Sequence, residues 1–131
     1  MAHFVSTANV GNLQCLGFET DAHVACGTGA FPTTDDIAQV PANGATVSNV
    51  FARVNTAPTA GQSYKVDVVE SDPAGISPVT PTVIKTCTIA VATTTCTDVS
   101  STTVAAGHYL QVQITNQGGA PNKAFRVSFR W

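Results

Sequence analysis

The end of the chain alternates strictly between apolar and polar side chains. An apolar residue occupies every second position, and the run reads Phe125, Arg126, Val127, Ser128, Phe129, Arg130 and Trp131. Successive side chains of a strand point to opposite faces, whereas a helix places residues three and four apart on one side. The pattern therefore predicts a strand with one buried and one solvent-facing side. We interpret it as the closing strand of a β-sandwich.

Similar alternation recurs through the second half of the chain, and turn sequences such as Asn43-Gly44 separate the alternating segments. Shorter extended pieces are expected in the first forty residues, where glycines interrupt them. No segment shows helical periodicity over three turns, so we expect an all-β, antiparallel β-sandwich of seven to nine short strands. The extended segments are residues 3–7, 13–18, 22–26, 37–40, 46–55, 62–71, 83–91, 97–105 and 110–114.

The composition is poor in charge. Charged residues make up 11% of the chain, against roughly 25% in an average soluble protein. Nineteen threonines supply polarity without charge, and threonine favours strands. This composition is more typical of an assembly subunit or a secreted protein than of a free cytosolic enzyme. The net charge of −2 predicts no general attraction to nucleic acid or to an acidic membrane.

The start of the chain lacks the basic residues and the apolar run of a signal peptide. No apolar stretch in the sequence reaches the length that crosses a membrane. We therefore expect no membrane partner. The protein either folds in the cytoplasm or has had a signal removed.

The charges are unevenly distributed along the chain. No lysine or arginine precedes Arg53, and no acid follows Asp98. The charges are either solvated on unrelated surfaces, or the acidic N-terminal region meets the basic last strand, within one subunit or across an interface. The second interpretation makes Arg126 and Arg130 possible interface residues. The N-terminal acids are Glu19, Asp21, Asp35 and Asp36.

Four cysteines form two local pairs, Cys15 with Cys26 and Cys87 with Cys96. Four cysteines allow three connectivities, and the sequence does not choose among them. Local pairing is our first interpretation, with residues 87–96 forming two strand segments around a hairpin. Such a short bridge stabilises a fold by about 2–3 kcal/mol. Free buried thiols are the alternative, because cytoplasmic folding disfavours disulfides.

No catalytic motif occurs in the chain, so we expect no enzymatic activity and no catalytic residues. Cys15, His23 and Cys26 could suggest zinc, but the cysteine spacing is too long for a zinc knuckle and a fourth ligand is missing. The acids Asp67 and Glu70 are interpreted as solvated turn residues rather than calcium ligands. The sequence therefore predicts no metal and no cofactor.

Tyr109 precedes a strand in which Leu110 and Val112 share the apolar face. It therefore points to the opposite side of that strand, where it could face outward. An outward-facing tyrosine is a candidate for contact with another subunit or for stacking on a sugar.

Four turn and strand motifs follow one another in the second part of the chain. They are a "proline, glycine, then a strand" entry at 41–50, a turn and an aromatic at 56–64, a cysteine-flanked segment at 87–98, and Val104-Ala-Ala-Gly-His108 before Leu110-Gln-Val112. By these motifs and their order, residues 40–131 resemble a β-sandwich domain of many phage structural proteins and of the ends of bacterial collagen-like proteins, although residues 72–81 are longer than the corresponding turn. The resemblance implies a jelly-roll-like sandwich that builds fibres, tips or capsid decorations, often as trimers.

We therefore expect a non-enzymatic virion protein, made in the host cytoplasm, that acts as a capsid, decoration or fibre subunit. Its partners would be copies of itself, as a trimer or larger assembly, and a capsid or fibre protein. We divide the chain into an irregular segment, residues 1–40, with intersubunit contacts, and a sandwich domain, residues 41–131. The alternative is an extracellular carbohydrate-binding adhesin or lectin-like module.

Overall fold

The computed structural model describes residues 1–11, 14–18, 23–25, 38–71 and 82–131. These residues form strands and turns, and no helix long and apolar enough to cross a membrane occurs among them. Ten strands are present, against the seven to nine expected. They are β1 (Ala2–Val10), β2 (Gln14–Phe18), β3 (His23–Ala25), β4 (Ala38–Gln39), β5 (Ala45–Val54), β6 (Ser63–Ser71), β7 (Thr82–Ile89), β8 (Thr95–Val104), β9 (Tyr109–Gln117) and β10 (Lys123–Arg130).

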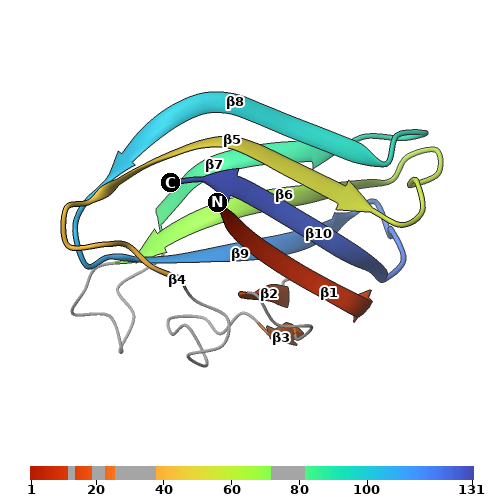
Figure 1. Cartoon of the computed structure of the whole chain (residues 1–131). Coiled ribbons are helices and arrows are strands. Elements are labelled where there is room, and N and C mark those ends of the chain that lie inside the picture. Colours follow the sequence, from red (N-terminus) through yellow and green to blue (C-terminus); the bar gives the residue numbers. More distant parts are fainter. Residues whose placement is uncertain (12–13, 19–22, 26–37, 72–81) are drawn as a thin grey trace.

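All strand pairs are antiparallel, and the strands form the two layers of a sandwich (Figure 1). Sheet A has the order β8-β5-β10-β1, and sheet B contains β7-β6-β9, with β4 paired to β9. Strand β2 belongs to both layers. Its Gly17 pairs with Val5 of β1, and its Cys15 pairs with Gln113 of β9. One side of the sandwich is therefore closed by continuous strand pairing.

The core lies between the two sheets, as the alternation predicts. Phe125, Val127 and Phe129 are each 1% exposed, which confirms β10 as an apolar-in strand. The ring of Phe129 stacks on that of Phe4, with 5.6 Å between centroids. Trp131 is only half-buried, and it meets Phe129 edge to face at 6.3 Å. The alternation thus continues to the last residue, but its burial weakens there.

Tyr64 anchors the centre of sheet B in this core. It is fully buried, and its ring meets Phe125 edge to face at 5.1 Å. Its hydroxyl donates a hydrogen bond of 2.7 Å to the carbonyl oxygen of Pro121, which satisfies the polar end of the side chain. Burial raises the pKa of the Tyr64 hydroxyl, so the group stays neutral and keeps its proton to donate.

The N-terminal strand is more regular than the sequence indicates. We expected an irregular segment over residues 1–40, but β1 runs through sheet A between β10 and β2. Phe4 and Val10 are fully buried there. The sequence pattern does not indicate this because alanine and serine stand at inward positions of β1, together with the larger apolar residues Phe4 and Val10. The sandwich therefore begins at β1 rather than at residue 41.

The other side of the sandwich is closed by side chains. Strands β7 and β8 stand at the two ends of the strand order and belong to different sheets. A disulfide between Cys87 of β7 and Cys96 of β8 joins them, as expected. The expected hairpin is wrong, because β7 pairs with β6 and β8 pairs with β5. The bridge therefore connects the two sheets across the side that strand pairing leaves open.

Lys85 of β7 also holds β7 and β8 together. Its side chain is 2% exposed, and its ammonium donates a hydrogen bond of 2.6 Å to the Ser100 hydroxyl of β8. The Asp98 carboxylate lies 4.0 Å from this ammonium and accepts from both the hydroxyl and the backbone N–H of Ser100. Buried charges need this kind of pairing, because an isolated ammonium is costly to desolvate.

Asp98 makes the stability of the fold depend on acidity. The Ser100 hydroxyl, and to a lesser degree Lys85, hold the pKa of Asp98 below its ordinary value of 3.8. A carboxyl group whose pKa is lower in the folded state stabilises the fold above its ordinary pKa, and this contribution disappears as the pH falls through the lowered value. Urea unfolding between about pH 5 and pH 2 should therefore show a smaller loss of stability for Asp98→Asn than for the wild type. An equal loss of stability in the two proteins over this pH range would contradict the prediction.

Candidate functional site

The outward-facing side of sheet A carries three exposed arginines: Arg53 on β5, and Arg126 and Arg130 on β10. We call these three residues the basic face. Arg53 and Arg126 are direct partners in the register of the two strands. Like charges placed opposite each other across two strands repel, so this pair weakens the sheet rather than supporting it.

The basic face has no carboxylate side chain opposite it among the described residues. Three acids are described, and each has a partner elsewhere: Asp67 contacts Lys65, Glu70 contacts His108, and Asp98 contacts Lys85. The N-terminal acids that we expected to meet the last strand lie outside the described residues. The positive charge of the basic face is therefore uncompensated within this part of the chain.

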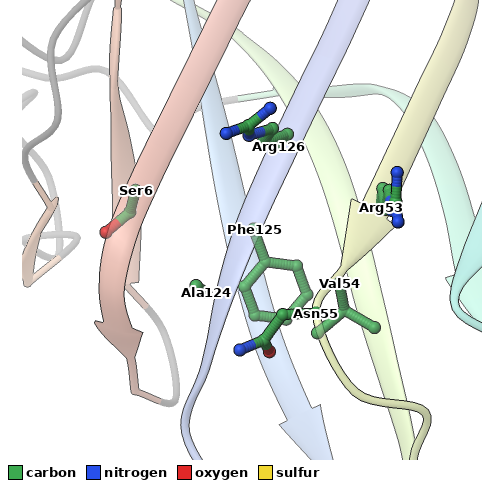
Figure 2. Close-up of a pocket in the computed structure, with 7 residues that line it drawn as sticks. All are labelled: Ser6, Arg53, Val54, Asn55, Ala124, Phe125 and Arg126. Carbon is green, nitrogen blue, oxygen red and sulfur yellow. The ribbon is translucent and has the colours of Figure 1, made fainter.

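A pocket of about 370 Å³ lies at one end of the basic face (Figure 2). It opens where the pairing of β1 with β10 shifts, since the five residues of β1 from Ser6 to Val10 lie opposite only three of β10, from Phe125 to Lys123. The extra length bends β1 away from its neighbour. The pocket is lined by Ser6, Arg53, Val54, Asn55, Ala124, Phe125 and Arg126.

The lining combines donors and apolar groups. Figure 2 shows Arg53 and Arg126 on neighbouring strands, with Asn55 and Phe125 below them and Ser6 across on β1. The backbone N–H of Asn55 donates to the Ala124 carbonyl at 3.2 Å, which fixes the end of β5 against β10. Guanidinium and amide groups donate hydrogen bonds to acid groups. The pocket is therefore suited chemically to an anion with an apolar part.

Tyr109 lies in the other sheet, away from the basic face. It pairs with Gln39 of β4 and Ser71 of β6, and it is half-buried. Leu110 and Val112 are fully buried on the opposite side of β9, as the alternation predicts. The structure therefore does not bring Tyr109 together with Arg126 and Arg130 on one surface.

The remaining candidate residues serve structural contacts. Cys15 is disulfide-bonded, so its sulfur is not a thiolate that could bind zinc. Its expected partner Cys26 lies outside the described residues, as does the side chain of His23. Among the described residues, no three potential ligands gather in a way that could hold a metal ion. Asp67 is buried and accepts a hydrogen bond of 2.6 Å from the Thr86 hydroxyl, so it is not the solvated turn residue that we expected.

The sequence pointed to Arg126 and Arg130 but not to Arg53 or Asn55. Arg53 occupies a polar position of an alternating strand, which predicts its outward direction. Its place beside Arg126 depends on the register of β5 against β10, and these strands are distant in the sequence. Charge segregation along the chain was the available signal, because Arg53 is the first cation.

No family model and no curated protein matches this sequence. Its fold is similar to that in "The Crystal structure of murine APRIL, pH 8.5", with a TM-score of 0.53 and 11% sequence identity over 99% of this chain and 97% of that one. At this identity the similarity shows the fold alone. It confirms the expected jelly-roll-like sandwich and leaves the phage and collagen-like resemblance without further support.

Proposed function

We propose that this chain is a non-enzymatic structural subunit that associates with copies of itself through the free edge of β8. The observation that carries the proposal is the exposure of this strand. Six of its ten residues are exposed, and Val99 is 77% exposed. An edge strand presents unpaired backbone N–H and C=O groups, which are ready to pair with another strand.

The usual protection of an edge strand is weak in β8. Proteins commonly guard such edges with lysine or proline, and β8 contains neither. Its one charged residue, Asp98, is directed to Lys85 rather than to solvent. One register shift, between Ser48 and Val50 of β5, interrupts the pairing of β5 with β8. A long, neutral edge rich in threonine and serine favours strand addition by a partner.

Antiparallel pairing of β8 with β8 of a second copy joins two sandwiches about a two-fold axis. Such a contact is isologous, because each copy contributes the same surface. Sheet A then continues across the dimer, and both free edges are covered. A trimer or larger assembly requires a further contact elsewhere on the molecule, for which the exposed Phe51 of β5 is a candidate.

We further propose that the assembly belongs to a virion, as a capsid, decoration or fibre subunit that contacts copies of itself and a capsid or fibre protein. The low content of charge and the order of turn motifs support this proposal. The disulfide-bonded Cys15, Cys87 and Cys96 suit a particle that persists in an oxidising environment outside the cell. Carbohydrate binding is the alternative, but half-buried Tyr109 offers less ring surface to a sugar than an exposed tyrosine does.

A lysine on the free edge of β8 tests the proposed contact. Val99→Lys places a charge where a second strand would pair, so we expect about a tenfold or greater increase in the dissociation constant of the assembly. Sedimentation velocity over a range of protein concentrations measures this change. Val91→Lys is the matched control, because Val91 is 48% exposed in the turn before β8 and should leave association unchanged.

The oligomeric state of the wild-type protein tests the proposed function itself. A strict monomer at high concentration that also fails to co-sediment with virus particles would contradict the structural-subunit proposal. If Val99→Lys does not weaken the assembly, the contact between copies lies elsewhere than on β8.

A further inference from the structure

We infer that the pocket at the Arg53–Arg126 pair binds a small organic anion of about monosaccharide size. This inference concerns the outer face of sheet A and is independent of the β8 contact proposed above. It rests on the uncompensated arginine pair, on the donors around the pocket and on the size of the pocket.

The arginine pair lowers the stability of the ligand-free protein. Arg53 and Arg126 are direct cross-strand partners, and no carboxylate side chain among the described residues contacts either of them. A cross-strand pair of like charges lowers stability. Positions at which a sequence breaks a local rule without visible compensation are typical of functional sites. An anion bound between the two guanidinium groups removes the repulsion.

The donors around the pocket suit an acid group. Each guanidinium presents a planar set of N–H donors that matches two oxygens of a carboxylate, sulfate or phosphate. Asn55 adds an exposed side-chain amide next to the pair. An oxyanion in this position receives donors from β5, from the end of β5 and from β10, which orients the anion as well as neutralising its charge.

The size of the pocket favours an organic ligand over an inorganic ion. Of the apolar residues at the pocket, Val54 and Phe125 are each 1% exposed, and only Ala124 is half-buried. The volume of about 370 Å³ lies within the range of roughly 300–1,000 Å³ that small-molecule sites occupy. A bare ion occupies only a small part of this volume, whereas a ring or short chain carrying the acid group fills more of it. The chemical class is therefore a compact molecule with one acid group and a carbon skeleton.

Calorimetric titration at constant ionic strength tests the inference with four probes: glucuronate, glucose 6-phosphate, glucose and inorganic phosphate. We expect saturable binding of one or both sugar acids, and the two acids distinguish a carboxylate from a phosphate as the preferred group. Glucose, which matches glucuronate in size but lacks its charge, should bind about tenfold more weakly or not at all. Inorganic phosphate should also bind more weakly, because it fills less of the pocket and makes fewer contacts with its lining.

Single arginine substitutions localise the binding. Arg53→Gln and Arg126→Gln should each weaken binding of the sugar acid about tenfold or more. Arg130→Gln is the matched control, since Arg130 belongs to the same basic face and strand as Arg126 but does not line the pocket. It should change the affinity by less than about twofold, because exposed charges at a distance are screened by salt.

A second readout shows that the variants fold. Without ligand, Arg53→Gln and Arg126→Gln should unfold at the same or a higher urea concentration than the wild type, because each removes the repulsion. Three results overturn the inference: no saturable binding of either sugar acid, equal affinity for inorganic phosphate, or an equal loss of affinity in Arg130→Gln. Val99→Lys should retain the binding, so failure of the β8 contact and failure of this site are distinguishable.

Discussion

Replacing Phe129 with alanine is expected to lower the free energy of unfolding by about 3–5 kcal/mol. Phe129 is 1% exposed and lies in β10, which β1 and β5 flank on its two sides. Its ring contacts Phe4 and Trp131, so the substitution leaves a cavity between the first and last strands. Because β10 is an interior strand, the surrounding structure can relax only in part. Urea unfolding followed by circular dichroism measures the loss.

Phe51→Ala is the matched control for this prediction. Phe51 is the register partner of Ser128 on the adjacent strand, but it is 42% exposed on the outer face of sheet A. Its removal should cost less than about 1 kcal/mol, as expected of a surface substitution. Both variants must be measured at a protein concentration at which the chain is monomeric, because Phe51 could be covered in an assembly. Equal losses in the monomer would mean that the core does not lie where the two sheets face each other.

The alternation of side chains predicted individual strands well but not their partners. The strands β5, β6, β9 and β10 lie within a few residues of the expected segments. Alternate side chains are buried over most of β5 and β10, whereas β6 buries four residues in succession, from Val66 to Val69, and β9 buries three, from Leu110 to Val112. Pairing between strands depends instead on contacts between distant residues. No pattern in residues 14–18 indicates that β2 pairs with one sheet at Cys15 and with the other at Gly17.

Lys85 and Val83 illustrate the same limit within one strand. The period of two places both residues on the face of Cys87 and Ile89. The structure buries Lys85, because Ser100 and Asp98 of β8 provide its partners. It leaves Val83 49% exposed, because the pairing of β6 with β7 shifts between Val68 and Val69. Periodicity therefore gives the direction of a side chain, and the neighbouring strand decides whether that direction leads to the core.

The candidate site was partly predictable for the same reason. Arg126 and Arg130 are polar positions of an alternating strand, so their outward direction follows from the sequence. The pocket beside them arises from the mismatch in length between β1 and β10 near Ser6, a property of two strands from opposite ends of the chain. The like-charged pair with Arg53 is likewise a matter of register. A search for cations that share a face becomes possible only once that register is known.

The two sides of the sandwich are closed by different means, and this difference predicts where the fold is weakest. On one side, β2 connects the sheets through backbone pairing. On the other side, β7 and β8 are held by the Cys87–Cys96 bridge and by Lys85 with its partners Ser100 and Asp98. The first connection consists of two register pairs of β2 with each sheet, whereas the second depends on one disulfide and on the side chains of Lys85, Ser100 and Asp98.

Replacing Cys87 and Cys96 together with serine is expected to lower the free energy of unfolding by about 2–3 kcal/mol, because the short loop between them is no longer restricted in the unfolded chain. The loss should be accompanied by faster amide hydrogen exchange in β7 and β8 than in the wild type, with little change in β10. Dithiothreitol, which also reduces the disulfide of Cys15, should lower the stability of the wild type by more than that of the double variant. If the double variant unfolds at the urea concentration of the wild type, then Lys85 and its partners suffice to hold the two sheets together on this side.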